Sequence, residues 1–338
     1  MSASASTTRV VSRAPGKLVV LGEYAVLNGA PALVLAVDRY CRATIGPSED
    51  EICHFASLTN TDEAVDFSAD AGSGYAVVDE VLQSLPNTGI WQGVLDSREL
   101  FAASMKLGLG SSAAALTAWA GAWAVFSGRE RLRADPRTLE TLIGLHQATQ
   151  AGAGSGVDVA ASLSGGVIRF QLNESSFPEV STVQLPEGVG FVGIFARSAA
   201  STPDFLARYE AWRAAEAEEA RALHAVLAEI AENGIGSASA DDAQGFLEAI
   251  TEYGRCLEYL GVCIGAHIVT PEHRELMKAA ERLGIAYKVS GAGGGDFGLA
   301  FSADAAALES FKRAADIECD VFEFGIDPSG LIVETVSE

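Results

Sequence analysis

The chain has 338 residues, of which 49% are hydrophobic and 20% charged, a composition typical of a folded globular protein rather than a disordered or fibrous one. At roughly 150 residues per domain, this length predicts about two domains. Asp and Glu (45) outnumber Lys and Arg (23), which gives a formal net charge of −22. A field of that sign disfavours a non-specific nucleic-acid binder or a protein of anionic membranes, so an anionic substrate needs a local group of basic residues.

Cysteine usage and the N-terminal stretch favour a cytoplasmic protein. The five cysteines are scattered without CxxC or Cys/His zinc spacing, so neither a disulfide framework nor a structural metal site is indicated. Residues 1–8 are small and polar and lack the apolar core of a signal peptide, and no apolar run reaches the ~18 residues of a membrane span. We expect no nucleic-acid or membrane partner, and a monomer or homodimer.

The first 86 residues are mostly β-rich. Apolar runs within 10–21 and 32–37 are separated by glycine- and proline-marked turns. Residues 45–67 alternate weakly and predict further strands, whereas 74–85 predicts a helix that ends before Pro86.

The pattern then changes to glycine loops that open into helices. Residues 108–112 form a glycine-serine loop, and the Ala-, Trp- and Leu-rich stretch 113–126 after it predicts a buried helix. A second helix is expected at about 139–150, before another glycine loop at 152–156. A β-rich run at 166–170 closes this part.

The polar stretch 171–188 contains Pro178 and Pro186, and we place the domain boundary there, giving domains 1–178 and 179–338. The second domain again mixes helices with sheet, so the fold class is α+β. Its expected elements are, in chain order, a strand at 189–195, an amphipathic helix at 203–232, a helix at 242–260, a helix start at Thr270-Pro271, and strands at 286–289 and 297–301 around a third glycine loop, 291–295.

The segment 106–112 is the most informative one for function. Glycines let a backbone approach an anion closely, and the unpaired N–H groups and positive dipole of a following helix suit phosphate. Ser111 and Ser112 can cap that helix, and a hydroxyl here can also reach the metal on a nucleotide. The alternative is an N-capped core helix with a tight entry turn. The segment 106–112 does not match a Walker A loop, and it lacks the preceding hydrophobic strand of a dinucleotide-binding fingerprint.

Two charged residues are candidates for chemistry. Asp158 follows the second glycine loop and could accept a proton from a substrate hydroxyl or orient it, or it could be a solvated turn aspartate. Lys17 lies at the entry of an apolar strand, where a lysine is ordinarily a surface residue. His146 is isolated on a helix of mixed polarity, which is more typical of a packed or surface histidine than of a catalyst.

Taken in order, segments 14–27, 106–114 and 288–296 resemble the three motifs of the GHMP small-molecule kinases, and the resemblance spans most of the chain. Within the family, the phosphomevalonate kinases are the most similar. The segments that carry this are 22–26 with 36–40, 96–97 before 106–110, 146–160 with 165–166, and 200–202. The chain departs from the family where 193–198, including Arg197, replaces a tryptophan-threonine-glycine stretch.

The resemblance implies a two-domain GHMP kinase fold, with a ribosomal-protein-S5-like N-terminal domain and a ferredoxin-like C-terminal domain, and the cofactors ATP and Mg²⁺. By position, Lys17 and Asp158 would be catalytic, Lys17 by stabilising charge and Asp158 as base or orienting carboxylate. Ser112 would also meet the metal. The implied nucleotide-binding residues are Gly108, Leu109, Gly110, Ser111, Ser112 and Ala113, and the implied acceptor-side residues are Lys106, Ser155, Ser201, Thr202, Gly293 and Gly294.

The activity this implies is ATP-dependent phosphorylation of (R)-5-phosphomevalonate to 5-diphosphomevalonate, in the mevalonate route to isoprenoids. The alternative is a mevalonate kinase or another alcohol-phosphorylating member, in which Asp158 would be a true base. A related decarboxylase is disfavoured because residues 14–17 lack its motif. A nucleotide-binding regulator without catalysis is a further alternative, against which the presence of both Lys17 and Asp158 argues.

Overall fold

The chain forms two compact units, each built from separated stretches of sequence. Strands β1 (Thr8–Leu21) and β2 (Ala32–Pro47) each run from one unit into the other, so the units are not consecutive segments. The division into 1–178 and 179–338 stays a prediction. The first unit contains Met1–Lys17, Ala36–Gly166 and Ile326–Glu338, and the second Leu18–Leu35 and Val167–Gly325. The computed structural model describes residues 8–69, 71–87, 89–102, 105–150, 154–173, 177–197, 202–315 and 319–337.

A mixed sheet is the frame of the first unit. Its strand order is β14-β1-β2-β5-β3-β4, in which β5 is antiparallel to β2 and parallel to β3. A short hairpin then leads to the first glycine-serine loop. The bounds are β3 (Cys53–Leu58), β4 (Glu63–Phe67), β5 (Trp91–Asp96), the 3₁₀ turn η2 (Arg98–Leu100), the hairpin strands β6 (Phe101–Ala102) and β7 (Met105–Lys106), and β14 (Ile332–Ser337).

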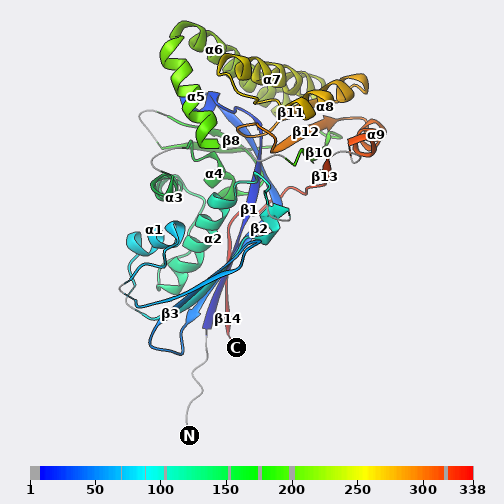
Figure 1. Cartoon of the computed structure of the whole chain (residues 1–338). Helices are drawn as coiled ribbons and strands as arrows, with labels where there is room; N and C mark the ends of the chain where they lie inside the picture. The colour runs from blue at the N-terminus through cyan, green and yellow to red at the C-terminus, as the bar shows by residue number, and fades with distance from the viewer. Residues whose placement is uncertain are drawn as a thin grey trace. The chain divides into compact units, whose positions relative to one another are not determined.

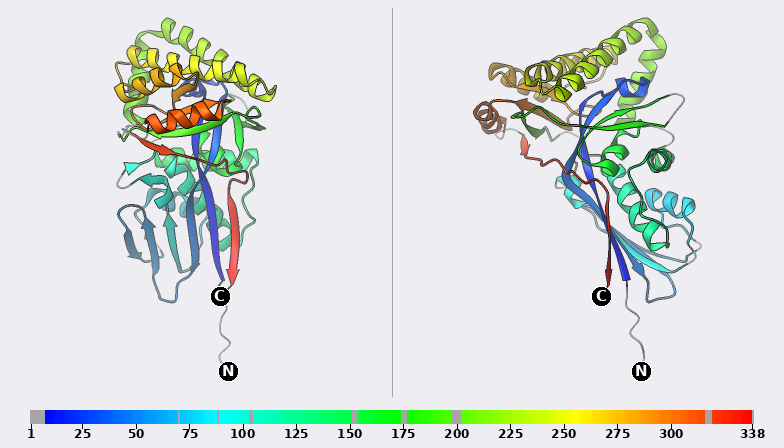
Figure 2. Two further views of the ribbon diagram at one scale, coloured as in Figure 1. Left: turned by 90° about the vertical axis from the view of Figure 1, so that its right-hand side faces the viewer. Right: turned by 180° about the vertical axis from the view of Figure 1, so that it is seen from behind.

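Four helices of the first unit lie on one face of its sheet, as Figures 1 and 2 show. They are α1 (Ala76–Ser84), α2 (Ser111–Phe126), α3 (Pro136–Thr149) and α4 (Val157–Ser164). Every residue of α2 from 113 to 124 is buried, which confirms the predicted buried helix. The ring of Trp119 packs edge-on against Phe55, at a centroid distance of 5.3 Å, and lies 5.5 Å from Trp91. Alanines around these indoles let the helix pack closely on all sides.

The second unit combines an antiparallel sheet of order β11-β12-β10-β13 with a group of helices. Helices α7 and α8 pack on β11, α9 packs on β10, and α6 packs on α7. The bounds are the 3₁₀ turn η1 (Ala25–Asn28), β8 (Val167–Gln171), β9 (Glu179–Val183), β10 (Gly190–Phe195), α5 (Thr202–Ala215), α6 (Ala217–Ser239), α7 (Ala243–Cys263), α8 (Pro271–Arg282), β11 (Ala286–Val289), β12 (Phe297–Ser302), α9 (Ala305–Ala315) and β13 (Asp320–Phe322).

The α+β class and most predicted elements are confirmed, including the Thr270 cap, whose hydroxyl accepts from the His273 amide at 3.3 Å. The prediction of one helix was wrong. The helix expected at 203–232 is two helices, because Glu216 leaves the helical region at φ −121°, ψ 54°. A run of Ala, Glu and Arg favours helix throughout and carries no signal for such a change. Among the described residues, no helix is both long and apolar enough to cross a membrane.

Candidate active site

The glycine-serine loop is held in place by its two leucines. Leu107 and Leu109 are buried, whereas Gly108 and Gly110 adopt φ of 72° and 73°, which favour glycine. Gly110 occupies the cap position of α2, and Ser111 and Ser112 are its first helical residues. The idea that a serine caps this helix was therefore wrong.

The start of α2 consequently offers unpaired amides. The first intrahelical bond runs from the Ala114 amide to the Gly110 carbonyl at 3.0 Å. The amides of residues 111–113 precede that bond, and Gly110 at the cap has no side chain that could accept from them. Amides of this kind, together with the positive end of the helix dipole, bind phosphate. The geometry fits the predicted nucleotide-phosphate loop better than it fits a capped core helix.

Lys17 lies directly against this loop. Its amide donates to the Leu109 carbonyl at 2.8 Å, and its ammonium lies 3.4 Å from the Gly108 carbonyl. The side chain is only 8% exposed, so the surface-lysine interpretation was wrong. The neighbouring Gly16 leaves no room for a side chain, since a Cβ there would lie 2.8 Å from the Leu109 carbonyl oxygen. The first and second motifs of the sequence are thus in backbone contact.

Asp158 completes this group. It lies in the first turn of α4, not in a solvated turn as the sequence alone suggested, and its Oδ1 is 3.6 Å from the Lys17 ammonium. Gly156 at the cap position of α4 has a φ of 82° and packs against Ile143, which orients the turn. A lysine and an aspartate far apart in sequence therefore meet beside Gly110, where a Cβ would lie 3.1 Å from Lys17 Cγ and 3.5 Å from Asp158 Cβ.

A buried histidine faces the same loop, and the sequence analysis missed its role. His146 on α3 is 5% exposed, and its Nε2 lies 3.2 Å from the Ser112 hydroxyl and 3.0 Å from the Gln150 amide nitrogen. Burial lowers the pKa of this imidazole, and the charge of Asp158 offsets part of that effect. In the sequence, His146 begins segment 146–160, which carries part of the family resemblance, and it lies four residues before Gln150.

The third glycine loop lies in the second unit, where a buried ion pair fixes it to the turn after β1. Lys288 on β11 pairs with Glu23, whose Oε1 also accepts from the Gly291 amide at 3.3 Å. The Tyr24 hydroxyl donates to the Ala292 carbonyl at 2.7 Å. Burial raises the pKa of the Glu23 carboxyl, and the Lys288 ammonium opposes that rise. The first and third motifs are therefore joined by buried polar contacts.

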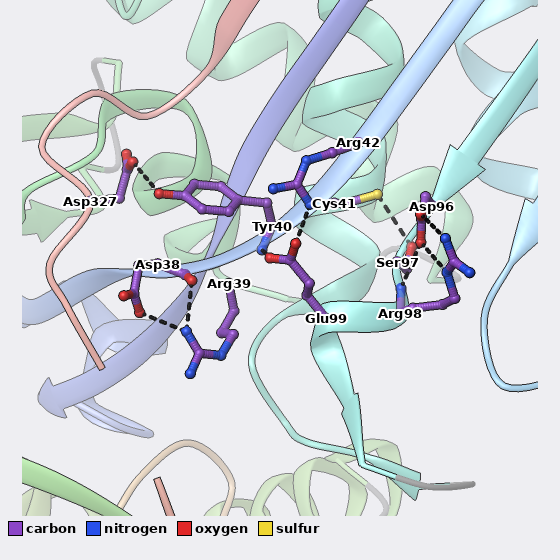
Figure 3. A network of polar contacts seen from close by, with 10 residues as sticks. All are labelled: Asp38, Arg39, Tyr40, Cys41, Arg42, Asp96, Ser97, Arg98, Glu99 and Asp327. Carbon is purple, nitrogen blue, oxygen red and sulfur yellow. Dashed lines mark hydrogen bonds and ion pairs between the residues drawn. The ribbon is translucent and has the colours of Figure 1, made fainter. Parts of the chain in front are cut away.

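Lys17 and Lys106 are cations beside the loop, and three arginines close to the sheet of the first unit pair with carboxylates. Lys106, at the end of β7, is exposed and stands two residues before Gly108. Figure 3 shows the paired groups along β2 and before β6: Arg39 with Asp38, Arg42 with Glu99, and Arg98 with Asp96.

Known sequences identify the family. The phosphomevalonate kinase of Streptomyces sp. (strain CL190) is 30% identical over 345 aligned residues, which cover 86% of this chain and 89% of that relative. The chain belongs to the GHMP kinase family. Residues 242–321 match the family model described as GHMP kinases C terminal. A mevalonate kinase of Thermococcus sibiricus (strain DSM 12597 / MM 739) is 27% identical over 59% of this chain and 61% of that relative.

The two-domain GHMP kinase fold expected from the sequence is also confirmed. The structure of Streptococcus pneumoniae phosphomevalonate kinase in complex with phosphomevalonate and AMPPNP matches with a TM-score of 0.80 and 20% identity, covering 94% of this chain and 99% of that one. Membership of this kinase family implies the use of ATP.

The loop of this GHMP kinase suits a cation that arrives with the nucleotide. Among the described residues, no group of three or more His, Cys, Asp or Glu side chains could hold a metal ion. The Ser112 hydroxyl lies in the first turn of α2, beside the amides at the start of that helix. Mg²⁺ typically keeps several waters and binds through one or two protein ligands together with substrate phosphates, and a single hydroxyl beside helix amides fits that mode of binding.

The acceptor-side residues are spread over both units, and their assignment stays a prediction. Ser155 accepts from the Val157 amide at 3.4 Å and so lies at the start of α4. Gly293 and Gly294 pack against Ile268, whose carbonyl accepts from the Gly294 amide at 2.9 Å. Ser201 and the side chain of Thr202 lie outside the described residues.

Arg197, which departs from the family pattern, is engaged by a carboxylate. Its Nε donates to Asp320 Oδ2 at 2.9 Å, and its Nη2 pairs with Asp320 Oδ1. This bidentate pair holds the end of β10 to β13. Arg197 is therefore less available to attract an anionic acceptor than its position in the sequence suggested.

Proposed function

We propose that this GHMP kinase transfers the γ-phosphoryl group of Mg·ATP to the phosphate of (R)-5-phosphomevalonate. The bond from the γ-phosphorus to the β,γ-bridging oxygen breaks, a new bond forms to an acceptor phosphate oxygen, and the products are ADP and 5-diphosphomevalonate. The relative from Streptomyces that covers most of the chain supports this acceptor.

The pairing of Lys17 with Asp158 beside Gly110 is the observation that carries the proposal. The amides of α2 would bind the nucleotide phosphates, Ser112 would hold a magnesium ion, which neutralises phosphate charge when bound, and the Lys17 ammonium would stabilise charge on the transferred group. Asp158 lies 3.6 Å from the Lys17 ammonium, and this contact holds its carboxylate beside the loop. A phosphate acceptor is already ionised and needs no base, so orientation by Asp158 is sufficient.

The acceptor-side residues that the family resemblance implies are Lys106, Ser155, Ser201, Thr202, Gly293 and Gly294. Lys106 supplies a charge for the acceptor phosphate, and the small and hydroxyl residues let the acceptor approach and hydrogen-bond. These assignments are part of the proposal.

A mevalonate kinase, or another alcohol-phosphorylating GHMP kinase, is the second candidate, supported by the mevalonate kinases among the relatives. In that case Asp158 must remove a proton from the hydroxyl, and its loss would cost ~100-fold to 10,000-fold in rate. A regulator that binds ATP without turnover is the third, and absence of ADP release with every acceptor would identify it.

A substrate panel tests the acceptor. We expect kcat/KM for 5-phosphomevalonate to exceed that for mevalonate by at least about 100-fold, because a site built to bind a phosphate leaves its charged groups unpaired when the phosphate is missing. ADP release coupled to NADH oxidation, with homoserine as a further acceptor, measures this. Turnover of mevalonate alone would transfer the assignment to mevalonate kinase.

Replacing Lys106 tests the side of the loop from which the acceptor is bound. Removal of a charge-assisted hydrogen bond from a closed site costs about 2 to 4 kcal/mol, so Lys106→Ala should lower kcat/KM for the phosphorylated acceptor by roughly 30-fold to 1000-fold. Lys278→Ala is the control, because Lys278 is exposed on α8 and pairs with Glu275 at 2.7 Å. Equal activity of the two variants at low ionic strength would remove Lys106 from the acceptor site.

A further inference from the structure

The imidazole of His146 contacts Ser112, which belongs to the predicted phosphate loop, but His146 is not itself one of the predicted binding residues. The histidine belongs to α3, and its Nε2 has two polar neighbours within hydrogen-bond distance, the Ser112 hydroxyl at 3.2 Å and the Gln150 amide nitrogen at 3.0 Å. His146 is only 5% exposed, and both contacts are partly buried.

The neighbours of Nε2 decide which ring nitrogen carries the proton. A side-chain amide nitrogen can only donate, so Gln150 at 3.0 Å requires the Nε2 lone pair to face it and places the imidazole proton on Nδ1. The Ser112 hydroxyl lies 3.2 Å from the same nitrogen, so it makes a favourable contact only by donating its own proton, and it shares the single Nε2 lone pair with the Gln150 amide. With its proton directed at His146, the Ser112 oxygen keeps both lone pairs for another partner.

We propose that His146 is a positioning residue that orients the Ser112 hydroxyl as an oxygen ligand for the magnesium ion of Mg·ATP. The inference rests on the proposed function, in which Ser112 meets that ion. Without the acceptor at Nε2, the hydroxyl is free to turn its proton towards the cation. Partners behind a metal ligand commonly act in this way, and their loss costs about 10-fold to 100-fold in metal affinity.

The test measures how much Mg²⁺ tightens the binding of AMPPNP, by titration calorimetry with and without the metal. His146→Leu should reduce this Mg²⁺-dependent gain by about 10-fold to 100-fold and leave metal-free AMPPNP affinity unchanged. His146→Gln, whose amide oxygen can accept from Ser112, should restore most of the gain. Leu142→Ala is the structural control: it removes a side chain that is 2% exposed on the same helix and should lower Tm while keeping the gain.

A double variant separates orientation from general packing. If His146 acts through Ser112, His146→Leu should cause no further loss in a Ser112→Ala background. Should His146→Leu fail to fold, Gln150→Leu replaces it, because Gln150 is exposed and its substitution should be tolerated. Without the Gln150 amide, either ring nitrogen of His146 can carry the proton. We therefore expect a smaller reduction of the Mg²⁺-dependent gain than in His146→Leu.

The remaining outcomes overturn the inference in distinguishable ways. Additive losses in the double variant, equal losses with and without Mg²⁺, or no change in Gln150→Leu would each do so. An unchanged gain in Ser112→Ala overturns it and leaves ATP-dependent phosphoryl transfer standing. Wild-type protein that binds no Mg·AMPPNP overturns both this inference and the proposed function.

Discussion

Gly110→Val should weaken ATP binding by at least about 100-fold in a protein that still folds, which corresponds to about 2.7 kcal/mol. Gly110 has a φ of 73°, which costs a residue with a side chain roughly 1–2 kcal/mol. A Cβ there would also lie 3.1 Å from Lys17 Cγ and 3.2 Å from Lys17 Cε. The substitution therefore displaces the lysine and fills the space that a phosphate needs in order to reach the amides of α2.

Gly128 provides a matched control at the other end of the same helix. Its φ is 74°, nearly that of Gly110, but no atom lies within 4 Å of the position a Cβ would take. Gly128→Val carries the same backbone cost and should bind ATP normally. Calorimetry with ATP, alongside thermal unfolding of both variants, makes the comparison. Wild-type ATP affinity in folded Gly110→Val would show that the loop is only an entry turn for a core helix.

Lys17→Ala is expected to lower kcat by about 100-fold to 1000-fold. The ammonium that this variant lacks is nearly buried and fixed between the Gly108 carbonyl at 3.4 Å and Asp158 at 3.6 Å. A lysine at the protein surface cannot supply a charge at this position. Its removal also leaves Asp158 without its cation beside the phosphates, which adds repulsion. Because the charge on the transferred group is stabilised most in the transition state, kcat should fall more than ATP affinity.

Steady-state kinetics with saturating ATP and acceptor measure this effect. Lys312→Ala is the control, because Lys312 pairs with Glu309 and Glu323 in the second unit and should leave kcat within about twofold. A kcat for Lys17→Ala within about threefold of wild type would mean that Lys17 only supports the loop backbone, through its amide bond to the Leu109 carbonyl.

Local sequence patterns predicted several of the helices and the family of this protein. The Ala-, Trp- and Leu-rich run after the glycine-serine loop predicted the buried helix α2, and Thr270-Pro271 predicted the start of α8, because helix periodicity and caps depend on neighbours within a few residues. The three glycine motifs, in this order, resemble those of the GHMP kinases, and this resemblance was sufficient to indicate the family.

Tertiary structure decided what the charged and polar residues of those motifs do. Lys17, Asp158 and His146 each had an ordinary surface or packing interpretation in the sequence, because a single polar residue carries no periodicity. Their partners come from other elements: β1 brings Lys17 to the loop before α2, α4 brings Asp158 to Lys17, and α3 brings His146 to Ser112. Partial burial lowers the effective dielectric constant around these contacts and so strengthens them, and burial depends on how strands and helices distant in sequence pack together.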